Sequence, residues 1–203
     1  MNLPDDNRSR ALLFGAAVAG IIVAHLLDPW FYAHFRVEEI FNEDWGRLLR
    51  VIGYLPLWLA AALALAMHDG RQRGFRRALL LGLTPALTGL VGEALKLFFR
   101  RERPGAHEGA YFIRPFSERT WSTSGLALPS SHAIVAFGGA AILSRIFPRA
   151  WPVWWALAWG CGLSRVAAGA HFFSDIVVAA GAAWLVVALL WVKQGPRISQ
   201  HNA

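Results

Sequence analysis

Long apolar runs are the feature that most constrains how this chain can fold. Six runs, each close to the roughly 20 residues that cross a bilayer as a helix, divide the sequence. They cover residues 11–27, 48–67, 78–99, 131–147, 151–170 and 175–192. We therefore expect an all-α fold, a six-span transmembrane helical bundle, with residues 1–203 forming a single integral-membrane domain.

The composition supports a membrane location and excludes other classes of protein. Hydrophobic residues make up 56% of the chain and charged residues 16%, which is unlike a water-soluble domain. The net charge of +7 does not indicate nucleic-acid binding, because long apolar runs separate the cations. The single cysteine, Cys161, excludes a disulfide within the chain, and no Cys/His cluster indicates zinc.

Arginine in the short connections predicts the orientation of the spans. Residues 68–77 carry four Arg, and Arg145, Arg149, Lys193 and Arg197 fall on the same side if there are six spans. The positive-inside tendency makes this side cytoplasmic, together with both termini. The connection over residues 100–130 then lies on the extracytoplasmic side, although it carries five Arg. Cations that break the orientation rule need another reason to be there.

Residues 37–51 lie in the first extracytoplasmic connection. Large apolar side chains recur there at spacings of about four, which predicts a short interfacial helix that leads into the second span. We expect it to act as a juxtamembrane anchor.

A first polar cluster closes the third span. Lys96 and Arg103 are seven residues apart, so on a helix they share one face, and Pro104 marks where that helix stops or turns. Two cations directed at one place suit an anion, whereas the alternative is that both side chains only extend towards the interface.

A second cluster opens the fourth span with Pro129, Ser130, Ser131 and His132. Ser at a helix start is ordinary capping chemistry, but the free N–H groups there also make an anion site. His132 in the first turn can donate a proton to a group bound at that site.

A third cluster closes the fifth span. An Arg inside an apolar helix, here Arg165, needs a partner, and a multiply charged anion would supply one. His171 and Asp175 are four residues apart, so the carboxylate can hold one imidazole nitrogen and leave the other as base or nucleophile. This pair can meet on a continuous helix, or with His171 in a turn and Ser174 as the cap of the sixth span.

Together, the three clusters resemble the signature of the type 2 phosphatidic acid phosphatase superfamily. The shared pattern is Lys, six residues, Arg-Pro; then Pro-Ser-x-His; then Ser-Arg, five residues, His, three residues, Asp, and it covers residues 96–175. One position departs from the pattern: the family usually has Gly where this chain has Ser131. Because Ser still presents its backbone N–H, we expect altered affinity or selectivity rather than lost activity.

The resemblance implies a role for each matched residue. His171 would attack phosphorus and form a phosphohistidine, Asp175 would orient it, and His132 would protonate the leaving oxygen and then activate water. The side chains that would hold the phosphate are Lys96, Arg103, Ser130, Ser131 and Arg165. It implies no metal and no cofactor.

Further residues around the motifs carry weaker expectations. Glu93 is expected to pair with Lys96. Arg100 and Arg101 are expected to contact lipid headgroups or to anchor the helix end at the interface. Residues 105–128, rich in Gly, Ser and aromatics, are expected to form a lid or headgroup pocket between spans three and four.

The expected function is that of a multi-pass lipid phosphatase of a bacterial cytoplasmic membrane, with its active site on the extracytoplasmic (periplasmic) side. The partners are the bilayer and a phosphorylated lipid: phosphatidylglycerophosphate, phosphatidic acid, undecaprenyl pyrophosphate or lipid A. One alternative is a lipid phosphotransferase with the same covalent step, and another is a non-catalytic carrier of anionic lipids. A soluble vanadate haloperoxidase shares a similar signature but would not need six apolar spans.

Overall fold

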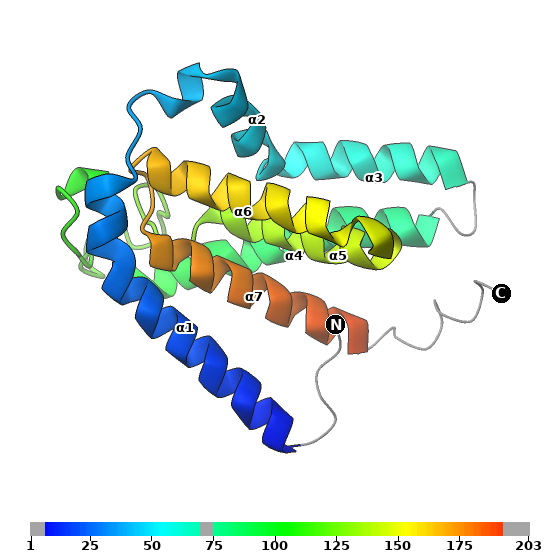
Figure 1. Ribbon diagram of the computed structural model, residues 1–203, viewed down its shortest axis with the longest axis horizontal. Helices are drawn as coiled ribbons and strands as arrows, with labels where there is room; N and C mark the ends of the chain where they lie inside the picture. Colours follow the sequence, from blue (N-terminus) through cyan, green and yellow to red (C-terminus); the bar gives the residue numbers. More distant parts are fainter. Residues whose placement is uncertain (1–6, 70–74, 193–203) are drawn as a thin grey trace.

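The computed structural model describes residues 7–69 and 75–192 as a helical bundle (Figure 1). Its α-helices are α1 Asn7–His34, α2 Asp44–Ile52, α3 Leu55–Asp69, α4 Phe75–Phe99, α5 Ser131–Ile146, α6 Trp151–Ala167 and α7 Phe173–Val192. Three short 3-10 turns accompany them: η1 Ile40–Asn42, η3 Pro104–Ala106 and η4 Pro148–Ala150. Between residues 101 and 126, extended backbone pairs as two isolated bridges. The all-α prediction is confirmed, whereas Arg71, Arg73, Lys193 and Arg197 lie outside the described residues.

Within the part of the chain that the structure describes, three helices, α1, α4 and α7, are long and apolar enough to cross a membrane. The bent pair α2 and α3 makes a fourth span if it is counted as one. Helix α5 has 16 residues and α6 has 17, so each is about 25 Å long against a hydrocarbon core of about 30 Å. The structure thus supports three or four spans by length, and the six-span arrangement stays a prediction.

The expected second span over residues 48–67 is wrong as a continuous helix. It is broken at Gly53 and Tyr54, where α2 and α3 meet at a bend of 68°. A Cβ added to Gly53 would lie 2.5 Å from the His132 carbonyl oxygen and 2.8 Å from Cys161 Sγ. The bend between α2 and α3 therefore packs closely against α5 and α6. The short helix predicted before this span is present as α2, which packs against α6.

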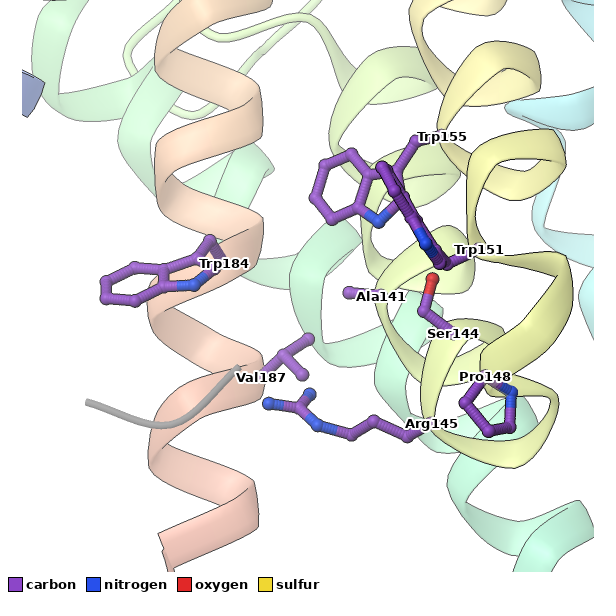
Figure 2. Close-up of a pocket in the computed structure, with 8 residues that line it drawn as sticks. All are labelled: Ala141, Ser144, Arg145, Pro148, Trp151, Trp155, Trp184 and Val187. Carbon is purple, nitrogen blue, oxygen red and sulfur yellow. The ribbon is translucent and has the colours of Figure 1, made fainter. Parts of the chain in front are cut away.

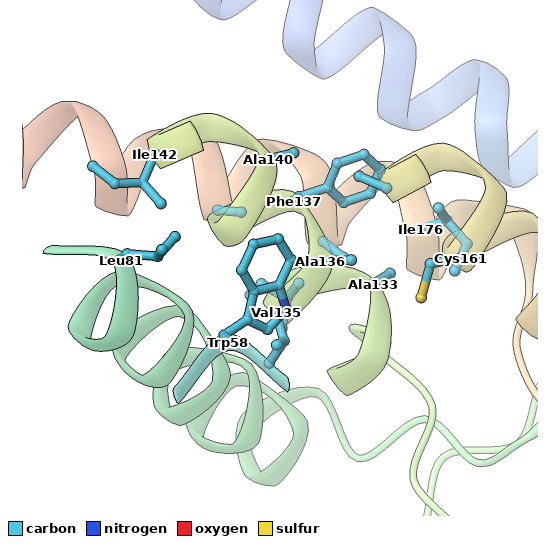
Figure 3. Packing of buried hydrophobic residues seen from close by; sticks show 14 of the residues in the cluster. Trp58, Leu81, Ala133, Val135, Ala136, Phe137, Ala140, Ile142, Cys161 and Ile176 are labelled. Carbon is cyan, nitrogen blue, oxygen red and sulfur yellow. The ribbon is translucent and has the colours of Figure 1, made fainter. Parts of the chain in front are cut away.

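Helix α5 is the centre of the bundle, because it packs against α4, α6 and α7. Ile134 and Phe137 are fully buried there, and Figure 3 shows Phe137 on α5 among the side chains of the core. Small residues let the neighbouring helices approach: a Cβ on Gly138 would lie 2.4 Å from Thr88 Oγ1. This close packing fixes the first turn of α5 relative to the ends of α4 and α6.

Helix α1 lies beside the start of α7 and diverges from it towards the other end of the bundle (Figure 1). Large apolar side chains along it, such as those of Phe14 and Leu26, are exposed, as expected for a surface that faces lipid. Near its C-terminal end, α1 packs against the start of α7, where the rings of Phe31 and Phe173 stack at 4.2 Å. The firm contacts of α1 therefore lie at the end of the bundle that carries the loop 100–130.

We predict that Gly139→Ala destabilises the protein, because the new Cβ would lie 2.3 Å from the ring of Trp58. Overpacking of this kind costs about 1–3 kcal/mol of unfolding free energy. Gly181→Ala is the matched control: no atom lies within 4 Å of its new Cβ, and Ala favours a helix. Thermal unfolding in detergent should show a lower midpoint for the first variant and an unchanged or higher one for the second. Equal midpoints would contradict the packing described for α5.

Candidate active site

The first motif lies where α4 ends, and its geometry differs from the prediction. Lys96 is in the last turn of α4, but the helix stops at Phe99, and Arg103 follows in extended backbone before η3. The prediction that Lys96 and Arg103 share a helix face is therefore wrong. Arg103 is instead held by backbone hydrogen bonds: its N–H donates to the Gly125 carbonyl at 3.1 Å, and the N–H of Gly105 donates to the Gly169 carbonyl at 3.2 Å. These bonds tie the segment after α4 to the segment after α6.

The early end of α4 is explained by Arg100, which has a left-handed φ of 54°. Its side chain is fully buried and donates to four carbonyl oxygens of the loop. The acceptors are Arg114 at 3.0 Å, Pro115 at 3.0 Å, Glu118 at 2.5 Å and Thr120 at 3.1 Å. The expectation of a headgroup or interfacial role for Arg100 is therefore wrong, because its guanidinium organises the loop 100–130.

Two hydrogen bonds at the start of α5 join the second motif to the first. Ser130 is the N-cap, and its buried Oγ accepts a bond from the Ala133 N–H at 3.5 Å. The Ser131 hydroxyl donates to Glu93 Oε1 at 2.6 Å and accepts from Lys96 Nζ. Lys96 also pairs with Glu93 at 3.1 Å, as expected. The hydroxyl that replaces the usual Gly thus contacts the cation and carboxylate of α4, and its backbone N–H remains in the first turn.

The third motif places His171 in a turn, as the second predicted geometry has it, but Ser174 lies in the first turn of α7 rather than at its cap. Gly169, with a φ of 64°, follows α6, and His171 lies in the turn before α7 begins at Phe173. His171 Nδ1 lies 3.3 Å from Asp175 Oδ2 and 3.1 Å from the Ala127 carbonyl oxygen. A carbonyl oxygen only accepts, so Nδ1 carries the proton and Nε2 keeps its lone pair. Burial is the main cause that lowers the pKa of His171, to about 4, so the imidazole is neutral at pH 7.

Asp175 is fully buried and accepts bonds from several donors. The Phe172 N–H donates to Oδ2 at 2.8 Å, and Arg101 Nη2 donates to Oδ1 at 2.5 Å. Arg101 is 4% exposed, so the expected headgroup or interfacial role is wrong for it as well. Its partner is the carboxylate that holds His171.

Sequence reasoning missed further residues behind this pair: Asp28, Arg101, Tyr111 and Ser174. Asp28 directly follows the first predicted span, which ends at residue 27, but α1 continues to His34 and Asp28 is buried. Arg101 Nη2 donates to Ser174 Oγ at 2.8 Å, and Tyr111 donates to Asp28 Oδ2 at 2.6 Å. The sequence did contain one signal: Asp28 is an acidic residue next to an apolar run, and an acid that is buried there requires a partner.

The cations of the three motifs belong to one electrostatic neighbourhood. Lys96 interacts with Arg103 and Asp175, and Arg165 interacts with Arg103 and with both His132 and His171. Arg165 is 6% exposed, and its guanidinium lies 5.1 Å from the centre of the Phe41 ring. The Nε atoms of Arg103 and Arg165 are buried without a hydrogen-bond partner. Buried donors without partners are uncommon, and oxygens of a bound anion would satisfy them.

A cavity of about 480 Å³ lies elsewhere, between the far ends of α5 and α7 and the start of α6 (Figure 2). Its lining residues are Ala141, Ser144, Arg145, Pro148, Trp151, Trp155, Trp184 and Val187. Arg145 is 14 residues along α5 from Ser131, which corresponds to about 20 Å of helix. This cavity therefore does not include the three motifs.

Comparisons with known proteins show the family of this chain. A model of the PAP2 superfamily matches residues 77–199. A lipid A 1-phosphatase from Rhizobium johnstonii is 32% identical over 120 residues, which cover 57% of this chain and 48% of the relative. This chain thus spans about half the length of that relative.

The fold is also found in a solved structure. The crystal structure of a transmembrane PAP2-type phosphatidylglycerolphosphate phosphatase from Bacillus subtilis matches with a TM-score of 0.54 at 17% identity. The match covers 88% of this chain and 98% of that one, and it shows a shared fold. The family model covers more than half of the chain and includes all three motifs. The chain therefore belongs to the PAP2 superfamily, as its motifs predicted.

Proposed function

We propose that this protein is a membrane lipid phosphatase that removes a phosphate from a phosphomonoester or pyrophosphate group through a phosphohistidine at His171. One observation carries the proposal: a neutral, buried imidazole bound through Nδ1 to Asp175 lies among Lys96, Arg103 and Arg165. Such an imidazole can act as a nucleophile, and the cations can bind the phosphate it attacks.

In the first half-reaction, His171 Nε2 attacks phosphorus and the bond from phosphorus to the lipid oxygen breaks. His132 donates a proton to the departing oxygen. The positive charge that develops on the His171 ring is balanced by Asp175, which lies 3.3 Å from Nδ1. The non-bridging oxygens are bound by Lys96, Arg103 and Arg165, so the mechanism needs no metal ion or cofactor.

In the second half-reaction, His132 accepts a proton from water, and the water oxygen attacks phosphorus. The bond from phosphorus to Nε2 breaks, which releases inorganic phosphate and restores neutral His171. Ser130 and Ser131 contribute the N-terminus of α5, where free backbone N–H groups favour an anion.

The membrane setting belongs to the same proposal. The three motifs lie at the end of the bundle that carries the loop 100–130, opposite to the end of α5 that carries Arg145 (Figure 1). Six helical segments that cross a bacterial cytoplasmic membrane would place this end on the extracytoplasmic side. A lipid phosphate at that surface would then reach His171 without leaving its leaflet.

Two relatives favour a phosphorylated membrane lipid as the substrate, one named for lipid A 1-phosphate and one for phosphatidylglycerolphosphate. The candidate substrates are these two, phosphatidic acid and undecaprenyl pyrophosphate. The acceptor of the phosphate is water in this proposal, and phosphate release measured beside phosphorylated lipid products separates it from a phosphotransferase.

We predict that His171→Ala abolishes phosphate release from all four lipids. Loss of a covalent nucleophile leaves only the residual effect of binding and charge, so turnover should fall by at least about 10³-fold. The matched control is His34→Ala, because His34 is an exposed histidine that contacts its own helix at Trp30. Full phosphatase activity in the purified His171→Ala protein would rule out His171 as the nucleophile.

We predict that His132→Ala accumulates the phosphoenzyme with an aryl phosphate, whose leaving group needs no proton. Attack by His171 is then preserved, whereas activation of water is lost and the intermediate persists. Protein denatured in alkaline detergent should carry a base-stable, acid-labile phosphate on His171. A His132→Ala protein that turns over as fast as wild type would exclude His132 as the acid and base.

We predict an acidic limit of kcat/KM set by His171 near pH 4. Burial lowers the pKa of His171 to about 4, so the attacking neutral form persists as the pH falls from 7 and is lost only near that value. The pH–rate profile should be measured with two substrates whose phosphate groups ionise differently. If the pH at which kcat/KM falls on the acidic side differs between the two substrates, it reports ionisation of the phosphate group. An acidic fall near pH 6.5 that is the same for both substrates would contradict a buried neutral His171.

A further inference from the structure

Asp28 is a buried carboxylate on α1 that faces the start of α7. It is 1% exposed, and its Oδ1 accepts a bond from the Ser174 N–H at 2.8 Å. Its Oδ2 accepts from the Ser174 hydroxyl at 2.5 Å and from the Tyr111 hydroxyl at 2.6 Å. Three donors from two other segments therefore converge on one carboxylate that belongs to none of the three motifs.

Arg101 connects this carboxylate to the one that holds His171. Its Nη2 donates to both Asp175 Oδ1 and Ser174 Oγ, and its Nη1 lies 3.9 Å from Asp28 Oδ2. The guanidinium also lies 4.8 Å from the ring centre of Phe172 and 5.0 Å from that of Tyr111. It thus packs beside two aromatic rings that contact each other, and it is shared by two carboxylates.

The charges in this network do not cancel. Two buried carboxylates share one guanidinium, and Tyr111 stays a neutral donor, because burial and the bond to Asp28 raise its pKa well above the usual range. One of these two carboxylates, Asp175, bonds to the imidazole that becomes positive when His171 is phosphorylated. Without Asp28, the single Arg101 would be neutralised by Asp175 alone, and Asp175 would stabilise the charged imidazole less.

We propose that Asp28 is a positioning residue for the nucleophile, acting through Arg101 and Ser174 on Asp175. This inference rests on the proposed function, because it concerns the same histidine. It gives α1 a part in the reaction beyond membrane anchoring: the helix delivers the carboxylate that fixes the charge and the orientation of the Asp175–His171 pair.

The competing explanation is that Asp28 only docks α1 onto the bundle. Few residues along α1 are buried, so loss of this contact would also loosen the helix. The stacked pair Phe31 and Phe173 offers a matched control, because it joins α1 to α7 one turn from Asp28 without a polar group. Phe31→Leu weakens docking and leaves the carboxylate network intact.

The experiment compares Asp28→Asn, Tyr111→Phe and Phe31→Leu with wild type and His171→Ala, on one phosphorylated lipid in detergent micelles. For each protein, kcat, KM, the rate of phosphohistidine formation after rapid mixing and the thermal unfolding midpoint are measured. We expect Asp28→Asn to lower kcat and the phosphorylation rate by about 10- to 100-fold with KM nearly unchanged, as for other residues that orient a reacting group. Tyr111→Phe should cause a smaller loss of kcat, because it removes one donor and keeps the charge.

Phe31→Leu should lower the unfolding midpoint and leave kcat close to wild type. The inference is overturned if Asp28→Asn keeps the wild-type kcat, or if Phe31→Leu loses as much kcat as Asp28→Asn at the same midpoint. In either case an inactive His171→Ala beside an active wild type would still support the phosphohistidine mechanism. A wild-type protein that forms no phosphohistidine would instead contradict the proposed function itself.

Discussion

The pairing of one carboxylate, buried at the start of an apolar helix, is the interaction on which the rest of this end of the molecule depends. Asp175 has no exposure to water, so its charge is tolerated only because donors from other segments surround it. Phe172 and His171 supply donors from the turn before α7, and Arg101 supplies one from the loop after α4. The requirement to pair one buried charge therefore draws together segments that lie about 70 residues apart in the sequence.

The loop 100–130 is built to meet this requirement. Arg100 gathers four carbonyl oxygens of the loop, and Arg101, the next residue, points to Asp175. A further ion pair stabilises the same loop, since Arg114 donates to Glu102 at 2.6 Å. In the proposed orientation the loop carries these arginines against the positive-inside tendency, and their partners are carbonyls and carboxylates of the protein. Arg103 and Arg165 have a buried Nε without a hydrogen-bond partner, as Arg101 does, and the oxygens of a bound phosphate would supply partners for those two.

Sequence spacing predicted most of the helical segments and the pairings of Glu93 with Lys96 and of His171 with Asp175, because apolar runs and short spacings between polar residues are local signals. It failed where a distant contact decides the backbone. Arg103 was expected on α4, but the bonds made by Arg100 end that helix first. The break at Gly53 depends on the approach of α5, and the burial of Asp28 depends on Ser174, which lies 146 residues away. None of these contacts produces a periodic pattern in the sequence, so spacing could not predict them.

The most direct test of the account is a crystal or cryo-electron microscopy structure of the protein with bound orthovanadate, which adopts the five-coordinate geometry of a phosphoryl group under attack. The account predicts vanadium bonded to His171 Nε2, with its oxygens bound by Lys96, Arg103 and Arg165 and its apical oxygen facing His132. Vanadate that binds to these cations away from His171, or that binds elsewhere in the bundle, would contradict the claim that this histidine is the nucleophile.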